Sequence, residues 1–158
     1  IYKMCGIAGY FGNLDMNPEA LQNCIQLMKR RGPDADAIYQ HSFSNQKVYL
    51  LHSRLSIIDL ESRANQPFRI GSKLLIFNGE LYNYLELKEE FKTQGHTFVT
   101  DSDTEVLLKT IIHYGWKGLD KCEGMWALAI YDEKDGSLLL SRDRFGEKPL
   151  YFYRDHTG

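Results

Sequence analysis

The sequence predicts an α+β fold built on antiparallel sheet. Its strand-like runs cluster together and its helical patterns cluster together, whereas regular alternation of the two would indicate parallel βαβ units. The C-terminal third consists of apolar runs separated by turn residues, which is typical of a meander of antiparallel strands. With 158 residues, of which 43% are hydrophobic and 25% charged, the chain has the size and composition of one globular domain.

The first helix is expected directly after residue 17. Asn17 is a good N-cap residue, and Pro18 suits the first helical position because an N–H there would have no intrahelical partner. Apolar residues then recur at helical spacing until Gly32-Pro33, which cannot continue a helix. We therefore expect this helix to end near Arg31.

Two further helices are expected in the middle of the chain. One starts near Asn83, where Glu86 would complete a capping box, and ends at Gly95. The other begins after the polar stretch 101–103, carries apolar residues at helical spacing and ends at Gly115.

The strand-like runs are short and bounded by turn residues. In the first two thirds of the chain they are Gly6–Phe11, Lys47–His52, Leu74–Phe77 and Thr97–Thr100. In the last third the expected meander consists of Met125–Tyr131, a turn over 132–136, Ser137–Ser141 and Leu150–Tyr153.

Charge and cysteine content exclude several classes of protein. The chain carries 19 basic and 21 acidic side chains, which gives no electrostatic footprint for nucleic acid or an anionic membrane. No apolar stretch approaches the roughly 20 residues that a membrane span needs. The three cysteines form no Cys-x-x-Cys pair, so we expect no metal site, and their odd number favours a reducing, cytoplasmic compartment.

Cys5 is the first candidate for chemistry. It follows Met4, which resembles a translation start before a small residue, a context in which the initiator Met can be removed. Cys5 would then hold a thiol nucleophile and a free α-amine, whose pKa of about 7.7–8.0 suits a general base. The dipeptide alone favours a simpler interpretation, in which Cys5 is a small apolar residue that opens a buried strand.

Asn78-Gly79 also allows two interpretations. Next to a strand-like run, Asn-Gly is the strongest short signal for a hairpin turn, and this interpretation is favoured locally. The alternative is an oxyanion hole, in which the Asn78 side-chain amide and the Gly79 N–H face a developing negative charge. A tight turn could serve both purposes.

Asp103, Arg54 and His52 are further candidates. Asp103 is either the N-cap or a first-turn carboxylate of its helix, which is favoured locally, or the partner of a ligand ammonium group. Arg54 is either a solvated strand end or a bidentate clamp for a substrate carboxylate. Among the five histidines, His52 is the one retained as an alternative base for a cysteine nucleophile.

Six motifs in a fixed order point to a family. They are Met4-Cys5-Gly6-Ile7-Ala8-Gly9, Arg30-Arg31-Gly32-Pro33-Asp34, His52-Ser53-Arg54-Leu55-Ser56-Ile57, Asn78-Gly79-Glu80-Leu81-Tyr82-Asn83-Tyr84, Asp101-Ser102-Asp103-Thr104-Glu105 and Arg142-Asp143-Arg144-Phe145-Gly146-Glu147-Lys148-Pro149-Leu150-Tyr151. Together they resemble the class II glutamine amidotransferase domain, in the version that begins glutamine-hydrolysing asparagine synthetases. The resemblance runs from Met4 almost to the end of the chain.

The resemblance implies a fold and a reaction. The fold is the four-layer α-β-β-α sandwich of N-terminal nucleophile hydrolases, with mainly antiparallel sheets. The reaction is hydrolysis of glutamine to glutamate and ammonia, in which Cys5 attacks the side-chain amide and its own amine is the base. Asn78 and Gly79 would stabilise the oxyanion of the tetrahedral intermediate.

The resemblance also implies how glutamine is bound. Arg54 would bind the α-carboxylate of glutamine, while Glu80 and Asp103 would receive its α-ammonium group. Main-chain groups around Leu55 and Ile57 would line the same pocket. One cation then meets the carboxylate and two anions meet the ammonium, so the charges are complementary.

The same resemblance sets the expected domain limits and partners. The amidotransferase domain is expected over residues 4–158, cut before its last strands at a hairpin turn over 156–158, with Ile1–Lys3 as an extension ahead of the start Met. The expected partners are L-glutamine and a synthetase domain or chain, and a homodimer is compatible with the family. No cofactor is expected in this domain, because ATP and magnesium belong to the synthetase.

Two alternatives stay open at this point. If Ile1–Lys3 are retained, the Cys5 nitrogen is a peptide amide and cannot act as a base, so the chain would be a catalytically silent module that binds glutamine or a partner. An unrelated Cys–His hydrolase would use His52 as its base and would be indifferent to those residues. The acceptor of the ammonia is aspartate or another carboxylate.

Overall fold

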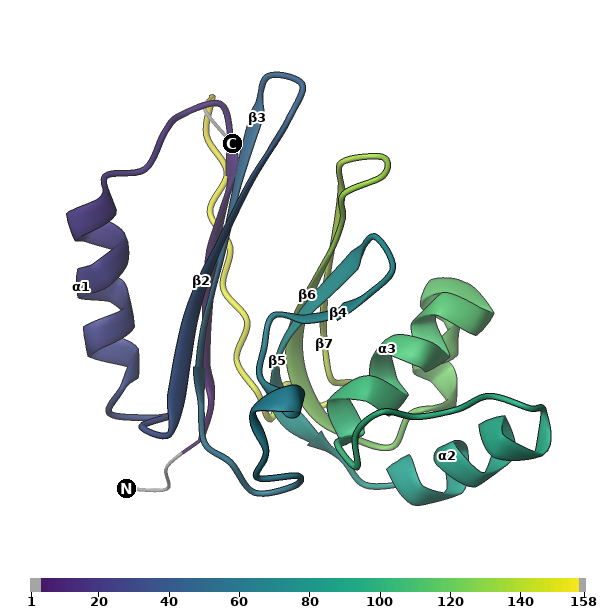
Figure 1. The fold of residues 1–158 in the computed structure, drawn as a ribbon. Helices are drawn as coiled ribbons and strands as arrows, with labels where there is room; N and C mark the ends of the chain where they lie inside the picture. Colours follow the sequence, from purple (N-terminus) through teal and green to yellow (C-terminus); the bar gives the residue numbers. More distant parts are fainter. Residues whose placement is uncertain (1–3, 157–158) are drawn as a thin grey trace.

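The structure, a computed structural model, describes residues 4–156. The expected extension Ile1–Lys3 lies outside this range, and so do the last two residues of the expected turn over 156–158. The described residues form four layers, helix, sheet, sheet and helices (Figure 1). The expected α-β-β-α sandwich of antiparallel sheets is therefore confirmed.

The first sheet has three antiparallel strands in the order β1-β3-β2. Their bounds are Gly6–Gly12 for β1, Ala35–Phe43 for β2 and Gln46–Arg54 for β3. The outer face of this sheet is covered by α1 (Pro18–Met28), which the Asn17 side chain caps as expected by accepting a hydrogen bond from the Glu19 N–H.

The second sheet has four antiparallel strands in the order β4-β5-β6-β7. Their bounds are Phe68–Ile70 for β4, Lys73–Leu81 for β5, Gly124–Asp132 for β6 and Ser137–Arg142 for β7. Its outer face carries α2 (Tyr84–Thr93) and α3 (Asp103–Tyr114). Two short 3-10 helices, η1 (Ser62–Ala64) and η2 (Gly115–Lys121), complete the regular structure of the described residues.

Each gap between layers is filled by apolar side chains. Alternation along a strand sends successive side chains to opposite faces, so each strand supplies two cores. On β3, Leu50 belongs to the core between the two sheets, whereas Leu51 packs under α1. On β5, Ile76 belongs to the core between the sheets, whereas Phe77 packs under α2 and α3. This alternation decides which polar residues meet at the end of the central layer.

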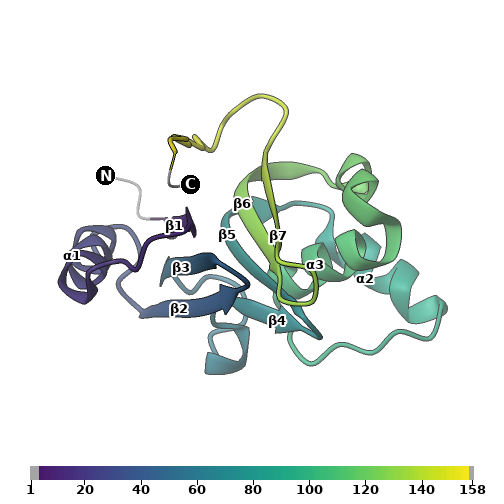
Figure 2. The same ribbon diagram turned by 90° about the horizontal axis from the view of Figure 1, so that it is seen from above.

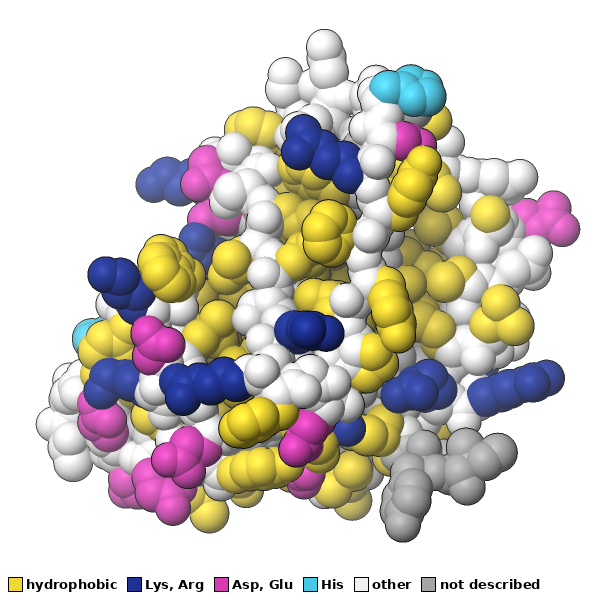
Figure 3. Space-filling view, turned by 180° about the vertical axis from the view of Figure 1, so that it is seen from behind, with side chains coloured by type: hydrophobic (Ala, Val, Ile, Leu, Met, Phe, Trp, Pro, Cys, Tyr) yellow, Lys and Arg dark blue, Asp and Glu magenta, His cyan; other side chains and the backbone are white. Residues whose placement is uncertain are grey.

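Beyond β7 the chain leaves the second sheet. Figure 2 shows this stretch, coloured yellow, running without regular structure from β7 to the side of β1. On the face seen from behind, hydrophobic side chains gather along the middle of the molecule (Figure 3). The strongly exposed aromatic side chains of this stretch are Phe145, Tyr151, Phe152 and Tyr153.

Asn78-Gly79 is not a hairpin turn, so the locally favoured interpretation is wrong. The two residues lie inside β5, opposite Ala127 and Trp126 of β6. A type I′ turn requires positive φ at both central residues, and neither Asn78 nor Gly79 has one. The turn that enters β5 is instead made by Gly71, whose φ is 60°.

Two expected strands are absent and two observed strands were not expected. The N–H groups of Val99 and Thr100 donate to the Glu105 carboxylate instead of a ladder, so Thr97–Thr100 is not a strand. Leu150–Tyr153 is also irregular. The strand β2 was missed because its polar residues hide the alternation of apolar positions, and β4 because three residues are too few to show a pattern.

One helix cap differs from the expectation. Asn83 forms no capping box, because its side chain bonds instead to the backbone of Lys121 and Glu123 ahead of β6. For α3, Asp103 is a first-turn carboxylate, one of the two local roles expected for it, and the N-cap is Ser102, whose hydroxyl accepts the Thr104 N–H at 3.1 Å. Asp103 is thus free to use its carboxylate elsewhere.

Candidate active site

A pocket opens at one end of the central layer, beside the N-terminus of α3. Seven of the eight residues that the resemblance assigns to catalysis or glutamine binding line it, and Asn78 does not. The seven are Cys5, Arg54, Leu55, Ile57, Gly79, Glu80 and Asp103.

Strand alternation brings these residues together. His52 and Arg54 continue the inward-facing positions of β3 that begin with the core residue Leu50. Asn78 and Glu80 likewise continue the inward-facing series of β5. The polar ends of two apolar strand faces therefore meet where the central core stops.

Cys5 lies just before β1 and touches the residue that follows β3. Its Sγ accepts a hydrogen bond from the Leu55 N–H at 3.4 Å and lies 3.7 Å from the Leu55 carbonyl oxygen. Burial raises the pKa of the thiol, against the opposing effects of the Leu55 contact and the charge of Arg54. The thiol is therefore protonated at neutral pH, and nucleophilic attack requires a base.

The edge of β5 that faces away from β6 is open near the pocket. The Tyr82 N–H, just after β5, donates to the Glu123 carbonyl on the β6 side. Backbone groups alternate between the two edges of a strand, so the even-numbered residues of β5 face β6 and the odd-numbered residues face the opposite edge. On that edge β4 pairs only with residues 73–75. Side chains replace the missing strand, because the Phe77 N–H donates to Gln66 and the Leu81 N–H donates to Asp103.

Gly79 lies between these two residues on the open edge. Within residues 4–156 its N–H has no partner among the loop and side-chain hydrogen bonds, and Gly79 lines the pocket. A side chain here would not fit, since a Cβ would lie 2.1 Å from the Met125 carbonyl oxygen. The arrangement leaves one backbone donor directed to the site, which is what an oxyanion hole requires.

Asn78 is buried and incompletely satisfied. Its side chain is 6% exposed, and among the described residues its Oδ1 is the one buried side-chain nitrogen or oxygen without a hydrogen-bond partner. Buried polar atoms without partners are rare in folded proteins and are often found at functional sites. The residue does not line the pocket but adjoins Gly79, which does.

Arg54 is not a solvated strand end, because its side chain is buried. Nη1 donates to the Glu61 carbonyl at 3.0 Å and to Asn65 Oδ1 at 2.7 Å. Nη2 donates to the carbonyl oxygens of Ile58, at 3.3 Å, and Asp59. The guanidinium group thus holds the loop over residues 58–65 through its two Nη atoms, and no group of the described residues accepts its Nε–H.

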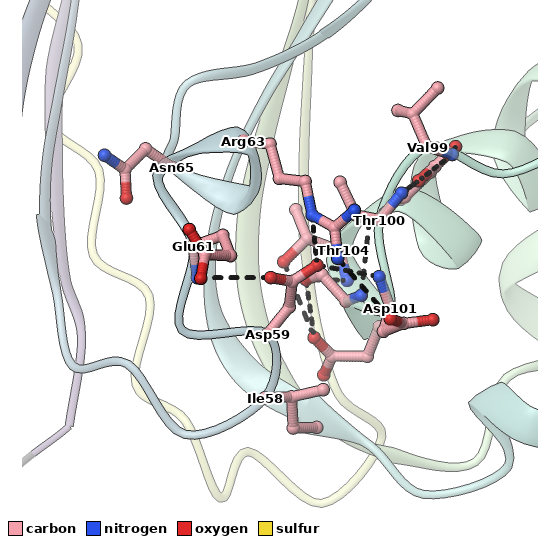
Figure 4. Close-up of polar contacts among 12 residues, drawn as sticks. Ile58, Asp59, Glu61, Arg63, Asn65, Val99, Thr100, Asp101 and Thr104 are labelled. Atoms are coloured by element: carbon pink, nitrogen blue, oxygen red, sulfur yellow. Dashed lines mark hydrogen bonds and ion pairs between the residues drawn. The ribbon is translucent and has the colours of Figure 1, made fainter.

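Asp59 holds the same loop through its own carboxylate (Figure 4). Its carboxylate accepts the N–H groups of Asp101 at 2.8 Å and Glu61 at 3.2 Å, and pairs with Arg63 at 3.1 Å. Burial opposes the charged form, but these contacts together hold the pKa of Asp59 below its ordinary value. The loop is thereby tied to the turn that precedes α3. Nothing in the local sequence distinguishes Asp59, or Gln66, as part of the site.

Asp103 and Glu80 make the other end of the pocket acidic. The Asp103 carboxylate is buried and accepts the Leu81 N–H at 3.1 Å. Burial raises the pKa of Asp103, and the nearby charge of Glu80 raises it further. A bound cation would relieve both effects, so this end of the pocket suits an ammonium group.

His52 does not line the pocket. Its imidazole is 1% exposed, and Nε2 lies 3.3 Å from the Phe77 carbonyl oxygen. Burial lowers the pKa of His52 to about 4. A base for Cys5 should be near the thiol and have a pKa near the working pH, so the geometry disfavours His52 in that role.

A model of the glutamine amidotransferase domain matches residues 4–158. The chain belongs to this family. Among its relatives, asparagine synthetase [glutamine-hydrolyzing] 1 of Bacillus subtilis is 42% identical over 94% of the amidotransferase chain and 24% of its own length. Putative asparagine synthetase [glutamine-hydrolyzing] 2 of Methanocaldococcus jannaschii is 37% identical over 96% of the chain and 32% of its own length. The chain therefore spans about a quarter to a third of these relatives.

The amidotransferase domain also resembles a relative with a different name and a solved structure. A protein named amidase chry2, of Gibberella zeae, is 36% identical over 94% of the chain and 24% of its own length. Among solved structures, glutamine phosphoribosylpyrophosphate amidotransferase from B. subtilis superposes with a TM-score of 0.50 and 25% identity, covering 60% of the chain and 23% of that protein. The likeness agrees with the sandwich described above.

Within residues 4–156 no group of three or more His, Cys, Asp or Glu side chains is placed to hold a metal ion. None of the helices in the same range has the length and apolar character for crossing a membrane.

Proposed function

We propose that this amidotransferase domain hydrolyses L-glutamine to glutamate and ammonia, with Cys5 as the nucleophile. The observation that carries the proposal is the pocket itself, where one thiol, one unpartnered backbone donor and a pair of carboxylates converge. Each of these matches a different part of the substrate.

The chemistry begins at Cys5 once the residues before it are removed. Its α-amine takes the thiol proton, and the thiolate attacks the side-chain amide carbon of glutamine. The Gly79 N–H and the Asn78 side-chain amide stabilise the oxyanion of the tetrahedral intermediate. The ammonium group of Cys5 returns the proton to the leaving nitrogen, ammonia departs, and water hydrolyses the thioester to glutamate.

Recognition of glutamine relies on charge. Glu80 and Asp103 accept the α-ammonium group, which offsets the cost of burying the Asp103 carboxylate. Arg54 meets the α-carboxylate, through its Nε–H or by exchanging a contact with the 58–65 loop. Main-chain groups of Leu55 and Ile57 line the same pocket.

The ammonia would serve an amidation outside these residues. Most of each relative lies beyond the matched part, and several are named as asparagine synthetases. We propose that the domain supplies ammonia to a synthetase that amidates a carboxylate, such as that of aspartate. The relative named as an amidase keeps other acceptors open.

Glutamate release from two forms of the chain tests the proposal. A form that begins at Cys5 should hydrolyse glutamine, whereas a form that retains Met4 and the residues before it should not, because its Cys5 nitrogen is an amide. Cys5→Ala in the first form is the control and should be inactive.

The opposite results are equally informative. Equal activity in both forms would overturn the α-amine as base. Binding of glutamine by calorimetry, with no glutamate released by either form, would instead support the alternative of a catalytically silent binding module.

A further inference from the structure

Both backbone polar groups of Phe77 are held by side chains from outside its sheet. The His52 Nε2 lies 3.3 Å from the Phe77 carbonyl oxygen, and the Phe77 N–H donates to Gln66 Oε1 at 2.6 Å. Because a carbonyl can only accept, Nε2 must carry the imidazole proton. These two side chains take the place of the strand that β4 does not provide here.

Phe77 immediately precedes the proposed oxyanion donors. The peptide group whose oxygen His52 binds also carries the Asn78 nitrogen, so its orientation sets the direction of the Asn78 side chain. The next peptide group carries the Gly79 N–H. A rotation of the backbone at Phe77 would therefore turn both donors away from the substrate.

We propose that His52 and Gln66 are positioning residues, which hold Phe77 so that the Asn78 amide and the Gly79 N–H converge on the reacting carbonyl. The proposal rests on the function proposed above and adds two residues to it. In this proposal neither side chain contacts the reacting atoms.

Burial and connectivity support this role. His52 comes from β3 of the first sheet, so its hydrogen bond joins the two sheets at the edge of the site. Gln66 is also buried, and its Nε2 donates to Thr104 Oγ1 at 3.3 Å, in the first turn of α3. Gln66 therefore supports both the part of β5 that precedes the oxyanion donors and the first turn of α3, which carries Asp103. Because His52 stays neutral above about pH 4, its donor persists over the working range.

The chain contains a matched control at the far end of the same layer. The His41 Nδ1, on β2, lies 2.8 Å from the Tyr131 hydroxyl, on β6, and this contact also joins the two sheets. His41 pairs with Val48 on β3, six positions before Arg54 at the pocket end of that strand. Loss of His41 therefore removes a comparable contact between the sheets without touching the edge of β5.

The test compares His52→Leu, His52→Gln, Gln66→Met and His41→Leu in the form that begins at Cys5. The measurements are kcat and KM for glutamine, and the affinity for the γ-semialdehyde of glutamate, which forms a tetrahedral adduct with a thiol. In His52→Leu and Gln66→Met, kcat should fall about 10- to 100-fold, since small misplacements are costly in catalysis. Affinity for the aldehyde should fall in parallel, and KM should change less than about threefold.

Two comparisons separate positioning from general stability. His52→Gln keeps an N–H donor and should recover part of the lost kcat, whereas His41→Leu should lower the melting temperature and leave kcat unchanged. If His52→Leu does not fold, the kcat of Gln66→Met and the partial loss in His52→Gln decide the matter.

The inference and the proposed function fail in different ways. A kcat within twofold of the parent in both His52→Leu and Gln66→Met, or an equal loss in His41→Leu, would overturn the positioning role alone. A parent protein that neither releases glutamate nor binds the aldehyde would overturn the proposed function, and the positioning role with it.

Discussion

The thiol of Cys5 lies 3.4 Å from the backbone nitrogen of Leu55, a residue fifty positions later in the chain. The contact follows from the β1–β3 register, in which Gly6 pairs with Ser53 and the next position brings Cys5 beside the end of β3. A slip of one residue would turn the Cys5 side chain toward the α1 face of the sheet. The register of one strand pair thus places the proposed nucleophile beside the residue that follows β3, ahead of the loop that Arg54 holds.

Cys5 should be alkylated selectively among the three cysteines. Burial raises the pKa of all three thiols, that of Cys122 to about 12, so only a cysteine that has its own base forms a thiolate near neutral pH, and the proposed α-amine gives Cys5 such a base. In the form beginning at Cys5, a glutamine-like electrophile should label this residue alone, and glutamine should protect it. Peptide mass mapping measures the labelling, and the unfolded chain, in which all three cysteines react, is the control. Equal labelling of Cys24 in the folded protein would contradict the assignment.

Asp103→Asn should weaken glutamine binding without weakening the fold. The folded-state pKa of Asp103 is raised, so above its unfolded pKa of 3.8 the ionised carboxylate costs stability, and removing its charge relieves that cost. We expect the KM for glutamine to rise about 10- to 100-fold, as for loss of a charge-assisted contact. The melting temperature at pH 7 should be unchanged or higher. Asp120→Asn, at an exposed position, is the matched control, and an unchanged KM in Asp103→Asn would count against the ammonium site.

Gly79→Ala should destabilise the protein strongly. The new Cβ would lie 2.1 Å from the Met125 carbonyl oxygen and 2.8 Å from the Trp126 Cα, both backbone atoms that can move only with β6. We expect a loss of about 3 kcal/mol in the free energy of unfolding, at the upper end for overpacking. Gly71→Ala is the comparison, because that glycine has a φ of 60° but open space around it, and should cost about 1–2 kcal/mol. Urea denaturation measures both, and similar losses would refute the steric argument.

His52 should make stability depend on pH between 6.5 and 4. Burial lowers its pKa from 6.5 to about 4, so within this window the unfolded chain binds a proton that the folded protein does not. The free energy of unfolding should therefore fall as the pH drops, by on the order of 3 kcal/mol from this residue. In His52→Leu the decline should be smaller by that amount, as measured by urea denaturation at a series of pH values. If the free energy of unfolding fell equally with pH in both proteins, the pKa of His52 would not be lowered by folding.

Asp59→Ala should loosen the loop over residues 58–65. The carboxylate satisfies two backbone N–H groups and pairs with Arg63, and alanine can replace none of these contacts. Faster amide hydrogen exchange is expected in the loop, together with a higher KM for glutamine and a smaller change in kcat. Asp135→Ala, at an exposed turn, should change neither amide exchange in the loop over residues 58–65 nor the KM for glutamine. Unchanged exchange in the Asp59 variant would assign the loop's order to Arg54 alone.

Local signals predicted some elements well and others not at all. The cap at Asn17 and the apolar run of β6 are complete within a few residues, so the sequence alone indicated α1 and β6. The strand β2 carries polar side chains, and only its long pairing with β3 defines it. Asn78-Gly79 carries the local signature of a turn, but pairing with β6 keeps it extended, because tertiary context overrides a weak local preference.

The sequence by itself determined the residue types, their order and the family that they indicate. It supplied a thiol directly after Met4, an Asn-Gly-Glu motif, an arginine at a strand end and an acidic helix start. The tertiary structure decided how these groups are used. It committed four N–H groups of Arg54 to a loop and placed His52 against Phe77. Because β4 is short, it also left the Gly79 N–H without a partner among residues 4–156. These partners lie many residues apart in the sequence. Sheet register and the packing of the layers therefore determine which groups meet, and local conformational preference does not.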